Sequence, residues 1–257
     1  KYGGIYTSWA EIEEKANMLK DISSGNNGSN SKPLYGPGLW AQLSETEKEA
    51  GFPISPGDAI WEDVNGDGII DNYDKVKIGN VFPKWTGGFN LSASWKGLTL
   101  SGRFDYALKY LKVDNSTPWI MGNMQGTFNT VSLVKDSFVY DAEHDTGTGK
   151  YPTYVYADQL GHRNYARANN PIFAYDASYL SIREITLSYS LPKALIEKIH
   201  LPGASIYVTG QNLGYITKAK NLATPEFKYE SSSYQTSAYG DGYPLPRILM
   251  FGLNLNF

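Results

Sequence analysis

The clearest pattern in the chain is an alternation of apolar and polar residues that begins near residue 85. In the stretch WTGGFNLSASW, Phe89, Leu91 and Trp95 fall on one parity, and small polar residues fall on the other. Because successive side chains of a β-strand point to opposite faces, this alternation predicts a strand with one apolar face. After a turn at Lys96 and Gly97, LTLSGRFDYAL repeats the pattern, which predicts an antiparallel hairpin.

Three more strands are predicted towards the end of the chain, in YLSIREITLSYSL, ASIYVTGQNLGYI and PRILMFGLNLNF. In the first, the apolar residues before Arg183 have the opposite parity to those after Glu184, which predicts a β-bulge at these residues. The predicted strands are about 10 to 13 residues long, whereas the usual strand length is about 5 or 6 residues. This length is close to the tilted span of a membrane barrel strand, about 9 to 11 residues.

The connections between these strands alternate in length. The turn at 96–97 and the connection at 192–203 are short, whereas the other stretches are long. Outer-membrane barrels have short periplasmic turns and long extracellular loops. With Phe257 at the periplasmic end, every long stretch falls outside the cell; chance agreement is the alternative. We therefore expect an extracellular loop region at 1–84 and C-terminal barrel strands at 85–257, with long extracellular loops at 111–177 and 215–244.

The N-terminal region predicts short helices rather than strands. SWAEIEEKANML and SETEKEAG each open with a capping box, Ser8 with Glu11 and Ser44 with Glu47, which is typical of helix starts. Between them, SSGNNGSNSKPLYGPG has the composition of turns and no periodicity. We therefore expect this region to be a long loop that contains short helices.

Residues 63–74 match the pattern of a calcium-binding loop. DVNGDG fits D-x-[DN]-x-[DN]-G, and Gly68 allows the sharp turn that brings oxygen ligands together. Position twelve is Asp rather than Glu, which shortens its reach. A bound calcium ion would have a structural role and would stiffen this loop, and a solvated acidic turn is the alternative. The predicted ligands are Asp63, Asn65, Asp67, the backbone carbonyl of Ile69, Asp71 and Asp74.

Composition narrows the class of protein only in part. The net charge of −3, from 23 basic and 26 acidic residues, gives no reason to expect nucleic acid as a partner. The absence of cysteine excludes disulfides and thiolate metal sites. The mean hydropathy of −0.38 is typical of a soluble protein, but a membrane β-barrel leaves only a weak hydropathy signal. The opening KYGGIYTSW has no signal-peptide pattern, so we expect any export signal upstream of Lys1 or removed.

Candidate catalytic chemistry is sparse. The three histidines, His144, His162 and His200, are far apart and lack metal-ligand spacing. The EHD stretch at 143–145 fits a solvated loop better than an acid–base pair. Carboxylates are abundant, but no pair of them is spaced in a way that indicates glycoside hydrolysis. We therefore expect that the protein is not an enzyme.

Three stretches together resemble SusC/RagA-type TonB-dependent transporters. They are the calcium-like loop that leads through IG and P-K into a hairpin, the strand–turn–strand that ends in GQNL, and the terminal YPLPRILMFGLNLNF. They occur in the order of the family and cover residues 56–106 and 177–257. One departure is TPE at Thr224–Glu226, where the family often has DPE.

The resemblance implies an all-β fold, the C-terminal part of an antiparallel transmembrane β-barrel of about 22 strands with a plugged lumen. Only about five or six strands have a counterpart here, too few to close a barrel without leaving unpaired edges in lipid. We therefore expect a piece of a longer protein that lacks the plug and the TonB-contacting segment.

Two groups of residues are candidates for contact with cargo or partners. Arg103 and Asp105 fall on the polar parity of their strand, so in a barrel they would face the lumen and touch the plug or the cargo. The 20 Tyr, 10 Phe and 6 Trp suit both the girdles of a barrel wall and stacking on sugar rings. In the 111–177 loop the candidates are Trp119, Tyr151, Tyr154 and Tyr156, and packing among themselves is the alternative.

The implied function is energy-coupled import of oligosaccharides or peptides across the outer membrane of a Gram-negative cell. The resemblance implies a SusD-like surface lipoprotein as a lid, TonB acting through the missing N-terminal region, and outer-membrane lipid around the barrel. The main alternative is a secreted, calcium-stabilised β-sandwich that binds carbohydrate. A dockerin-like module is a weaker alternative, because it normally needs two calcium loops and the sequence shows one.

Overall fold

The computed structural model describes residues 1–22, 32–114, 117–118, 121, 131–153, 170–196, 201–220, 224–226 and 245–256. The chain forms two compact units. Residues 1–78 and 113–174 make the first, the loop unit, and residues 79–112 and 175–257 make the second, the sheet unit. Among the described residues, no helix combines the length and the apolar character needed to cross a membrane.

This division differs from the predicted one, which placed a boundary after residue 84 and treated 111–177 as a loop between strands. Most of that loop belongs with the N-terminal residues because it packs against them. The backbone N–H of Thr153 donates to the carbonyl of Gly57 at 2.8 Å, and Ile172 packs against the buried cluster that contains Trp61. Such contacts join distant parts of the chain, so no local sequence pattern predicts them.

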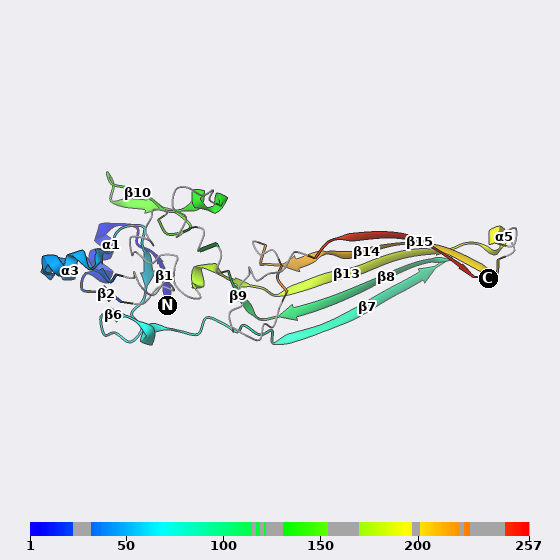
Figure 1. Ribbon diagram of the computed structural model, residues 1–257, viewed down its shortest axis with the longest axis horizontal. Helices are drawn as coiled ribbons and strands as arrows, with labels where there is room; N and C mark the ends of the chain where they lie inside the picture. Colours follow the sequence, from blue (N-terminus) through cyan, green and yellow to red (C-terminus); the bar gives the residue numbers. More distant parts are fainter. Residues whose placement is uncertain are drawn as a thin grey trace. The chain divides into compact units, whose positions relative to one another are not determined.

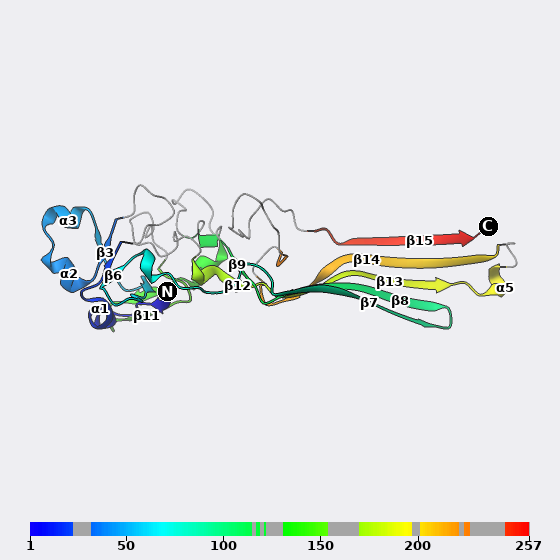
Figure 2. The same cartoon turned by 90° about the horizontal axis from the view of Figure 1, so that it is seen from below.

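The sheet unit is built on one five-stranded sheet with the strand order β15-β14-β13-β8-β7 (Figures 1 and 2). All neighbouring strands are antiparallel. Each strand predicted from the alternation is present, which confirms the predicted fold class for this unit. The strands are β7 (Trp85–Trp95), β8 (Leu98–Leu108), β13 (Tyr179–Ser190), β14 (Gly203–Thr217) and β15 (Ile248–Asn256).

The turn between β7 and β8 is as short as the sequence predicts. Lys96 has φ 47° and Gly97 has φ 84°, the two positive values that a type I′ hairpin turn requires. Glycine adopts a positive φ without steric cost. The hydroxyls of Ser94 and Thr99 lie 2.8 Å apart beside the turn, so the hairpin closes with a cross-strand hydrogen bond.

The predicted β-bulge lies at Arg183. On β8, Phe104 pairs with Ile182 and Arg103 pairs with Glu184, so Arg183 has no partner in the register. The register of β13 with β14 shifts at the same point, next to Asn212, whose φ is 52°. An extra residue in one strand bends it and re-aims its side chains. The bulge thereby resets the parity, as the sequence predicted.

One face of the sheet is apolar across all five strands. Pairing sets Ala93, Leu100, Leu187, Val208 and Phe251 in one row that crosses the whole sheet. The exposed fractions are 51% for Leu100, 39% for Leu187 and 81% for Phe251, so the described part of the chain leaves this face uncovered. Other exposed apolar residues of this face are Phe89, Leu91, Trp95, Leu98, Ile206, Leu249, Leu253 and Leu255.

The opposite face of the sheet is polar. The row next to the apolar one consists of Ser92, Ser101, Thr186, Thr209 and Met250. The hydroxyls of Thr186 and Thr209 lie 2.8 Å apart, within hydrogen-bonding distance. The two faces therefore differ sharply in polarity, although adjacent residues along each strand supply them.

The loop unit combines short strands and helices. β1 (Tyr2–Ile5) pairs with β5 (Ala59–Trp61), and a second sheet has the order β4-β3-β2-β6. These strands are β2 (Lys20–Asp21), β3 (Leu34–Tyr35), β4 (Phe52–Pro53) and β6 (Ile69–Ile70). The helices are α1 (Trp9–Ala16), α2 (Pro37–Gln42), α3 (Glu45–Glu49), η1 (Asn72–Asp74), η2 (Ser132–Asp136) and η3 (Pro171–Phe173).

The remaining elements are short. β10 (Val139–Asp141) and β11 (Thr146–Thr148) form a hairpin within the loop unit. β9 (Leu111–Val113) pairs with β12 (Ala174–Asp176) where the chain passes from one unit to the other. Helix α5 (Lys193–Ile196) lies in the short connection between β13 and β14. The described part of the 111–177 stretch, which was predicted as a long loop, thus contains short strands and helices.

The two predicted helix starts are both present, although only one has a complete capping box. Ser44 and Glu47 exchange both hydrogen bonds at the start of α3. At α1 the Ser8 side chain accepts from the backbone N–H of Glu11, but the Glu11 carboxylate accepts from the N–H of Thr7 instead of Ser8. The capping box predicted at Ser8 and Glu11 is therefore only half formed.

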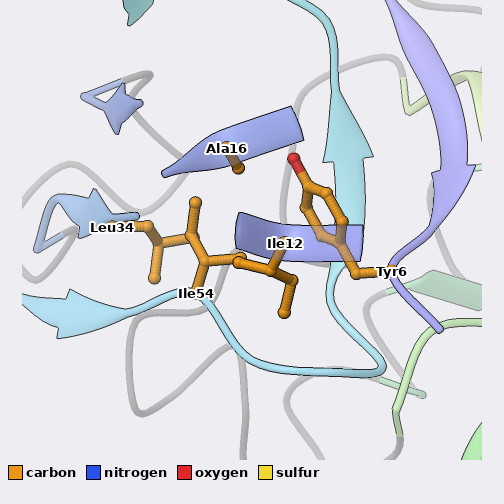
Figure 3. Packing of buried hydrophobic residues seen from close by; sticks show 5 residues of the cluster. All are labelled: Tyr6, Ile12, Ala16, Leu34 and Ile54. Carbon is orange, nitrogen blue, oxygen red and sulfur yellow. The ribbon is translucent and has the colours of Figure 1, made fainter. Parts of the chain in front are cut away.

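Helix α1 carries the centre of the loop unit's core. Tyr6, Ile12, Ala16, Leu34 and Ile54 form one buried cluster (Figure 3). Ile12 and Ala16 are four residues apart, so they lie on the same side of the helix, and their exposed fractions are 0% and 1%. The apolar side of α1 therefore packs against Leu34 of β3 and against Tyr6 and Ile54, which lie just outside the strands.

Replacing Ile12 with Ala removes buried carbon atoms from this cluster and leaves a cavity. We expect the loop unit to lose about 2 to 5 kcal/mol of stability, measured by native-state hydrogen exchange at the amides of α1. The matched control is Glu13→Ala on the exposed side of the same helix, with an expected change within about 0.5 kcal/mol. Equal losses in both variants would show that this cluster is not what stabilises the helix.

Candidate functional site

The polar face of the sheet carries an arginine cluster at the bulge. The Arg183 guanidinium donates to both carboxylate oxygens of Asp105, with Nη2 3.0 Å from Oδ2, and its Nη1 donates to Oε1 of Glu226 at 2.6 Å. The Tyr179 hydroxyl donates to Asp105 at 3.4 Å. One arginine thus bridges two carboxylates in a partly buried site, where its planar fork makes a two-point contact with Asp105.

Glu226 ends the described stretch Thr224–Glu226, and each residue of this stretch accepts a hydrogen bond from a side chain of the sheet unit. The Glu226 carboxylate accepts a second hydrogen bond from the Tyr215 hydroxyl. Lys112 Nζ donates to the carbonyls of the first and last residues of the segment, at 3.2 and 2.7 Å. The Tyr110 hydroxyl donates to the carbonyl of the proline between them. These contacts fix one point of the long connection between β14 and β15.

In the sequence this segment stands out only as a departure from DPE, and no local pattern indicates that the sheet unit binds it. Thr224 Oγ1 accepts from the backbone N–H of Glu226 at 3.2 Å. Asp and Thr side chains both accept from a backbone N–H two residues on, so threonine keeps the local turn that an aspartate would make. Arg183 was predicted only as a bulge position, because its two partners lie far away in the sequence.

The two residues predicted to face the lumen, Arg103 and Asp105, both lie on the polar face, in separate networks. Asp105 binds Arg183, whereas Arg103 lies 3.8 Å from Glu184, and its side chain is 61% exposed. Glu184 also accepts from the Gln211 side chain at 3.0 Å. Because of the bulge, the consecutive residues Arg183 and Glu184 both reach this face. Charge on the described polar face is therefore concentrated near the bulge.

The acidic loop at 63–74 is closed by its own hydrogen bonds. The carboxylate of Asp63 accepts from the backbone N–H groups of Gly66 at 2.6 Å and Gly68 at 2.7 Å. Gly68 has φ 82°, as expected for the sharp turn. Asp74 accepts from the N–H of Val64 at 2.7 Å, together with those of two further residues of the loop. Asp74 thus joins the end of the loop to its beginning.

The environment of Asp74 keeps this carboxylate charged. Burial by itself raises the pKa of Asp74, but the hydrogen bonds from the backbone N–H groups of Asp71, Val64 and Asn65 outweigh it, so the pKa lies below its ordinary value. The side chain is almost completely buried, with 2% of the residue exposed. Several hydrogen bonds from N–H groups favour the ionised form of a buried carboxylate, and this carboxylate links the parts of the loop that donate to it.

The donor types of this loop suit a hard cation, because they are carboxylate and amide oxygens. The Asp67 and Asp71 side chains accept from the backbone N–H groups of Ile69 and Tyr73. These bonds use only part of the roughly four acceptor positions of each ionised carboxylate. Among the described residues, no three acidic or histidine side chains converge in a way that could hold a metal ion. Calcium binding at this loop remains a prediction.

Of the four aromatic candidates in the 111–177 stretch, the described part of the chain includes only Tyr151. It is 3% exposed, and its ring stacks on Phe173 with centroids 5.7 Å apart. A buried ring cannot act as a surface stacking platform, so for Tyr151 this agrees with the alternative that the ring packs within the protein. Trp119, Tyr154 and Tyr156 lie outside the described residues.

The EHD stretch has a structural role that sequence reasoning missed. Asp145 accepts from the backbone N–H of Trp9 at 2.9 Å and of Ala10 at 3.3 Å. These are free N–H groups at the start of α1, where a negative charge is favourable. The Tyr140 hydroxyl donates to Asp145 at 2.6 Å, while His144 pairs with Asp141 at 2.7 Å. The β10–β11 hairpin therefore caps a helix far away in the sequence.

The contact between Tyr140 and Asp145 shifts both groups. The hydrogen bond to the Asp145 carboxylate raises the pKa of Tyr140 from 10.0 to about 12. The same bond, with that from the N–H of Trp9, lowers the pKa of Asp145 below its usual 3.8. The stabilisation from Tyr140 is therefore complete below pH 10 and lost as the pH rises towards 12. That from Asp145 is complete above pH 3.8 and lost as the pH falls through the lowered pKa.

We expect the ultraviolet absorbance of the Tyr140 phenolate, taken as the difference between the protein and its Tyr140→Phe variant, to titrate near pH 12. The control is the same difference measured in an Asp145→Asn background. There we expect the midpoint to return towards 10, because the carboxylate that disfavours ionisation is gone. A midpoint near 10 with Asp145 present would contradict the contact.

The chain is similar to known TonB-dependent receptors. No family model matches the chain. The TonB-dependent receptor P26 of Formosa agariphila is 27% identical over 228 residues, which is 86% of this chain and 22% of the relative. The TonB-dependent receptor P3 of the same organism is 27% identical over 207 residues, which is 79% of this chain and 19% of the relative. The chain thus spans about a fifth of the length of these receptors.

A solved structure shows the same fold. The RagAB peptide importer in its 'closed-closed' state matches 100% of this chain and 22% of its own, with a TM-score of 0.53 and 19% sequence identity. The predicted resemblance to SusC/RagA-type transporters is thereby confirmed. The similar proteins are named as receptors and as an importer, not as enzymes, in line with the prediction that the chain is not an enzyme.

Proposed function

We propose that the chain is part of a TonB-dependent nutrient importer of the outer membrane, and that its sheet unit forms part of the barrel wall. The observation that carries this proposal is the apolar face that crosses all five strands and stays exposed among the described residues. Soluble monomers rarely expose apolar patches larger than a few hundred Å². Lipid tails would cover this face without any further protein.

The dimensions of β7 support a membrane-spanning wall. The strand has 11 residues, and a rise of about 3.4 Å per residue with a tilt of about 45° gives a vertical span of roughly 24 Å. The apolar band of an outer-membrane barrel is about 25 Å tall and has aromatic girdles at both edges. Trp85 and Trp95, at the two ends of β7, share the apolar face and are 62% and 71% exposed.

The polar face would then line the lumen. Arg103 and Asp105 would face the interior, as predicted, with the arginine cluster near the end from which the long connections leave. The short connections, at 96–97 and between β13 and β14, would lie on the periplasmic side, because short periplasmic turns are usual in these barrels. The long connections would lie outside the cell.

The proposed partners and cargo follow from the resemblance. A SusD-like surface lipoprotein would act as a lid, and TonB would supply energy through an N-terminal region of the longer protein. The cargo would be an oligosaccharide or a peptide. The names of the similar receptors support TonB dependence, and the name of the importer supports a two-component assembly that carries peptides.

The alternative is a secreted β-sandwich that binds carbohydrate. Two sheets of a sandwich pack face to face and bury the apolar side of each. Leu91, Leu100 and Phe251 are more than half exposed, and no second sheet covers them among the described residues. The importer is therefore the better explanation of this face.

A charge on the apolar face of β7 tests the membrane assignment. Leu91 lies near the middle of the strand, so we expect Leu91→Arg to destabilise the folded protein by about 2 to 4 kcal/mol in a bilayer. The matched control is Ser92→Arg, the next residue, which points to the polar face and should change stability far less. The measurement is the folded fraction in lipid vesicles against urea concentration.

The membrane assignment can also be tested by fractionating cells. The natural protein should stay with the outer-membrane fraction and require detergent for extraction. Recovery in aqueous buffer as a detergent-free monomer would exclude the importer, and equal tolerance of both arginine variants would exclude lipid on the apolar face.

We further propose that the 63–74 loop holds a structural calcium ion. The donor types and the positive φ of Gly68 support this assignment. We expect isothermal titration to show a dissociation constant on the order of 10⁻⁴ to 10⁻³ M, the range of extracellular modules. Asp63→Ala should abolish the binding, whereas Glu62→Ala, next to it but outside the predicted ligands, should not. No heat of binding at millimolar calcium would rule out the site.

A further inference from the structure

The acidic loop contains an Asn-Gly pair, Asn65 and Gly66, whose chemistry does not require a bound ion. The backbone nitrogen that follows an asparagine can attack the side-chain amide carbon. A glycine at that position leaves the nitrogen unshielded, because it has no Cβ. Both residues are exposed to solvent, and a Cβ at Gly66 would meet no other atom within 4 Å. Neither water nor the nitrogen is therefore blocked by neighbouring side chains.

This reaction of Asn65 needs no reagent other than water. The nitrogen of Gly66 loses its proton and bonds to Cγ of Asn65, while the bond from Cγ to Nδ2 breaks. The proton goes to the leaving nitrogen, so ammonia departs and a five-membered succinimide ring remains. Water then opens the ring at one of its two carbonyl carbons. Opening at Cγ gives aspartate, and opening at the backbone carbonyl carbon gives isoaspartate.

Each group that must move in this reaction is held by a hydrogen bond inside the loop. The attacking nitrogen, that of Gly66, donates to Oδ1 of Asp63 at 2.6 Å. On the Asn65 amide, Oδ1 accepts from the backbone N–H of Asp67 at 3.1 Å, and Nδ2 donates to the Asp67 carboxylate at 2.9 Å. The folded loop therefore restrains both the nucleophile and the amide that it attacks.

The bond to Asp63 has the most direct effect, because it holds the attacking nitrogen itself. Its acceptor is a carboxylate, and hydrogen bonds to charged groups are stronger than those between neutral groups. The other oxygen of Asp63 accepts from the backbone N–H of Gly68 at 2.7 Å, so the carboxylate is fixed and cannot follow Gly66 as it turns. The bond must break before the nitrogen reaches Cγ, and its free energy adds to the barrier.

We propose that Asn65 is a site of spontaneous modification to aspartate and isoaspartate, and that the hydrogen bond from Gly66 to Asp63 slows this reaction in the folded protein. Aspartate would add a negative charge beside Asp63 and Asp67. Isoaspartate would add a carbon atom to the backbone of a loop whose ends Asp74 joins. This proposal goes beyond the import function and depends on neither a membrane nor calcium.

The test incubates the full-length protein in detergent at mildly alkaline pH, with a chelator so that no bound cation takes part. Peptide mapping by mass spectrometry follows the replacement of the Asn65 amide by a carboxylate, and enzymatic methylation detects isoaspartate. A synthetic peptide of residues 61–70 gives the rate without the folded loop. We expect the protein to react about tenfold or more slowly than the peptide, because a hydrogen bond to a charged group must first break.

Asp63→Ala removes the acceptor of the attacking nitrogen. We expect Asn65 in this variant to react about tenfold or more faster than in the parent. The matched control is Glu62→Ala, which removes the neighbouring carboxylate, whose partner is Lys1 at 2.7 Å. This control should leave the rate close to that of the parent.

A second variant keeps the test decisive if Asp63→Ala does not fold. In Asp63→Asn an amide oxygen can still accept from Gly66 but carries no charge, so we expect a rate between those of the parent and the peptide. A parent rate equal to that of the peptide, or no acceleration in the Asp63 variants, would overturn the proposal. Equal acceleration in Glu62→Ala would also overturn it, because the charge of the loop and not this hydrogen bond would then set the rate.

Discussion

The sheet unit depends on one constraint: its backbone groups are paired strand to strand, and one of its faces is apolar and exposed across all five strands among the described residues. In lipid each backbone N–H and C=O must find its partner within the protein, and an antiparallel sheet provides this between neighbouring strands. In the proposed barrel wall, strand length would follow from membrane thickness, and tryptophans lie at both ends of β7. The polarity of the opposite face follows from the two-residue period of a strand.

The bulge at Arg183 has the largest local effect on this sheet. By adding one residue to β13, it lets two consecutive charged side chains reach the polar face and binds one of them to two carboxylates. The polar rows beyond it, towards the β7–β8 turn, consist of serine, threonine and other uncharged residues. The sheet therefore confines its charges to the end where the long connections leave, and there it anchors one of them.

The loop unit shows how long connections can be ordered without large sheets. It has buried clusters around Ile12 and Trp61, and carboxylates that accept backbone N–H groups add further order. Asp74 closes the acidic loop, and Asp145 caps α1 from another part of the chain. Each is a short polar side chain that satisfies N–H groups left free by a turn or a helix end.

The sequence by itself determined the five strands, the 96–97 turn, the position of the bulge and both helix starts. These features arise from neighbouring residues, through the period of a strand or the reach of a capping side chain, so they can be read locally. Only the tertiary structure decided that residues 113–174 join the N-terminal residues, that Asp145 caps α1, and that Arg183 holds Glu226. Those contacts join residues from 43 to 136 positions apart, and the folding of the whole chain, not any local pattern, brings them together.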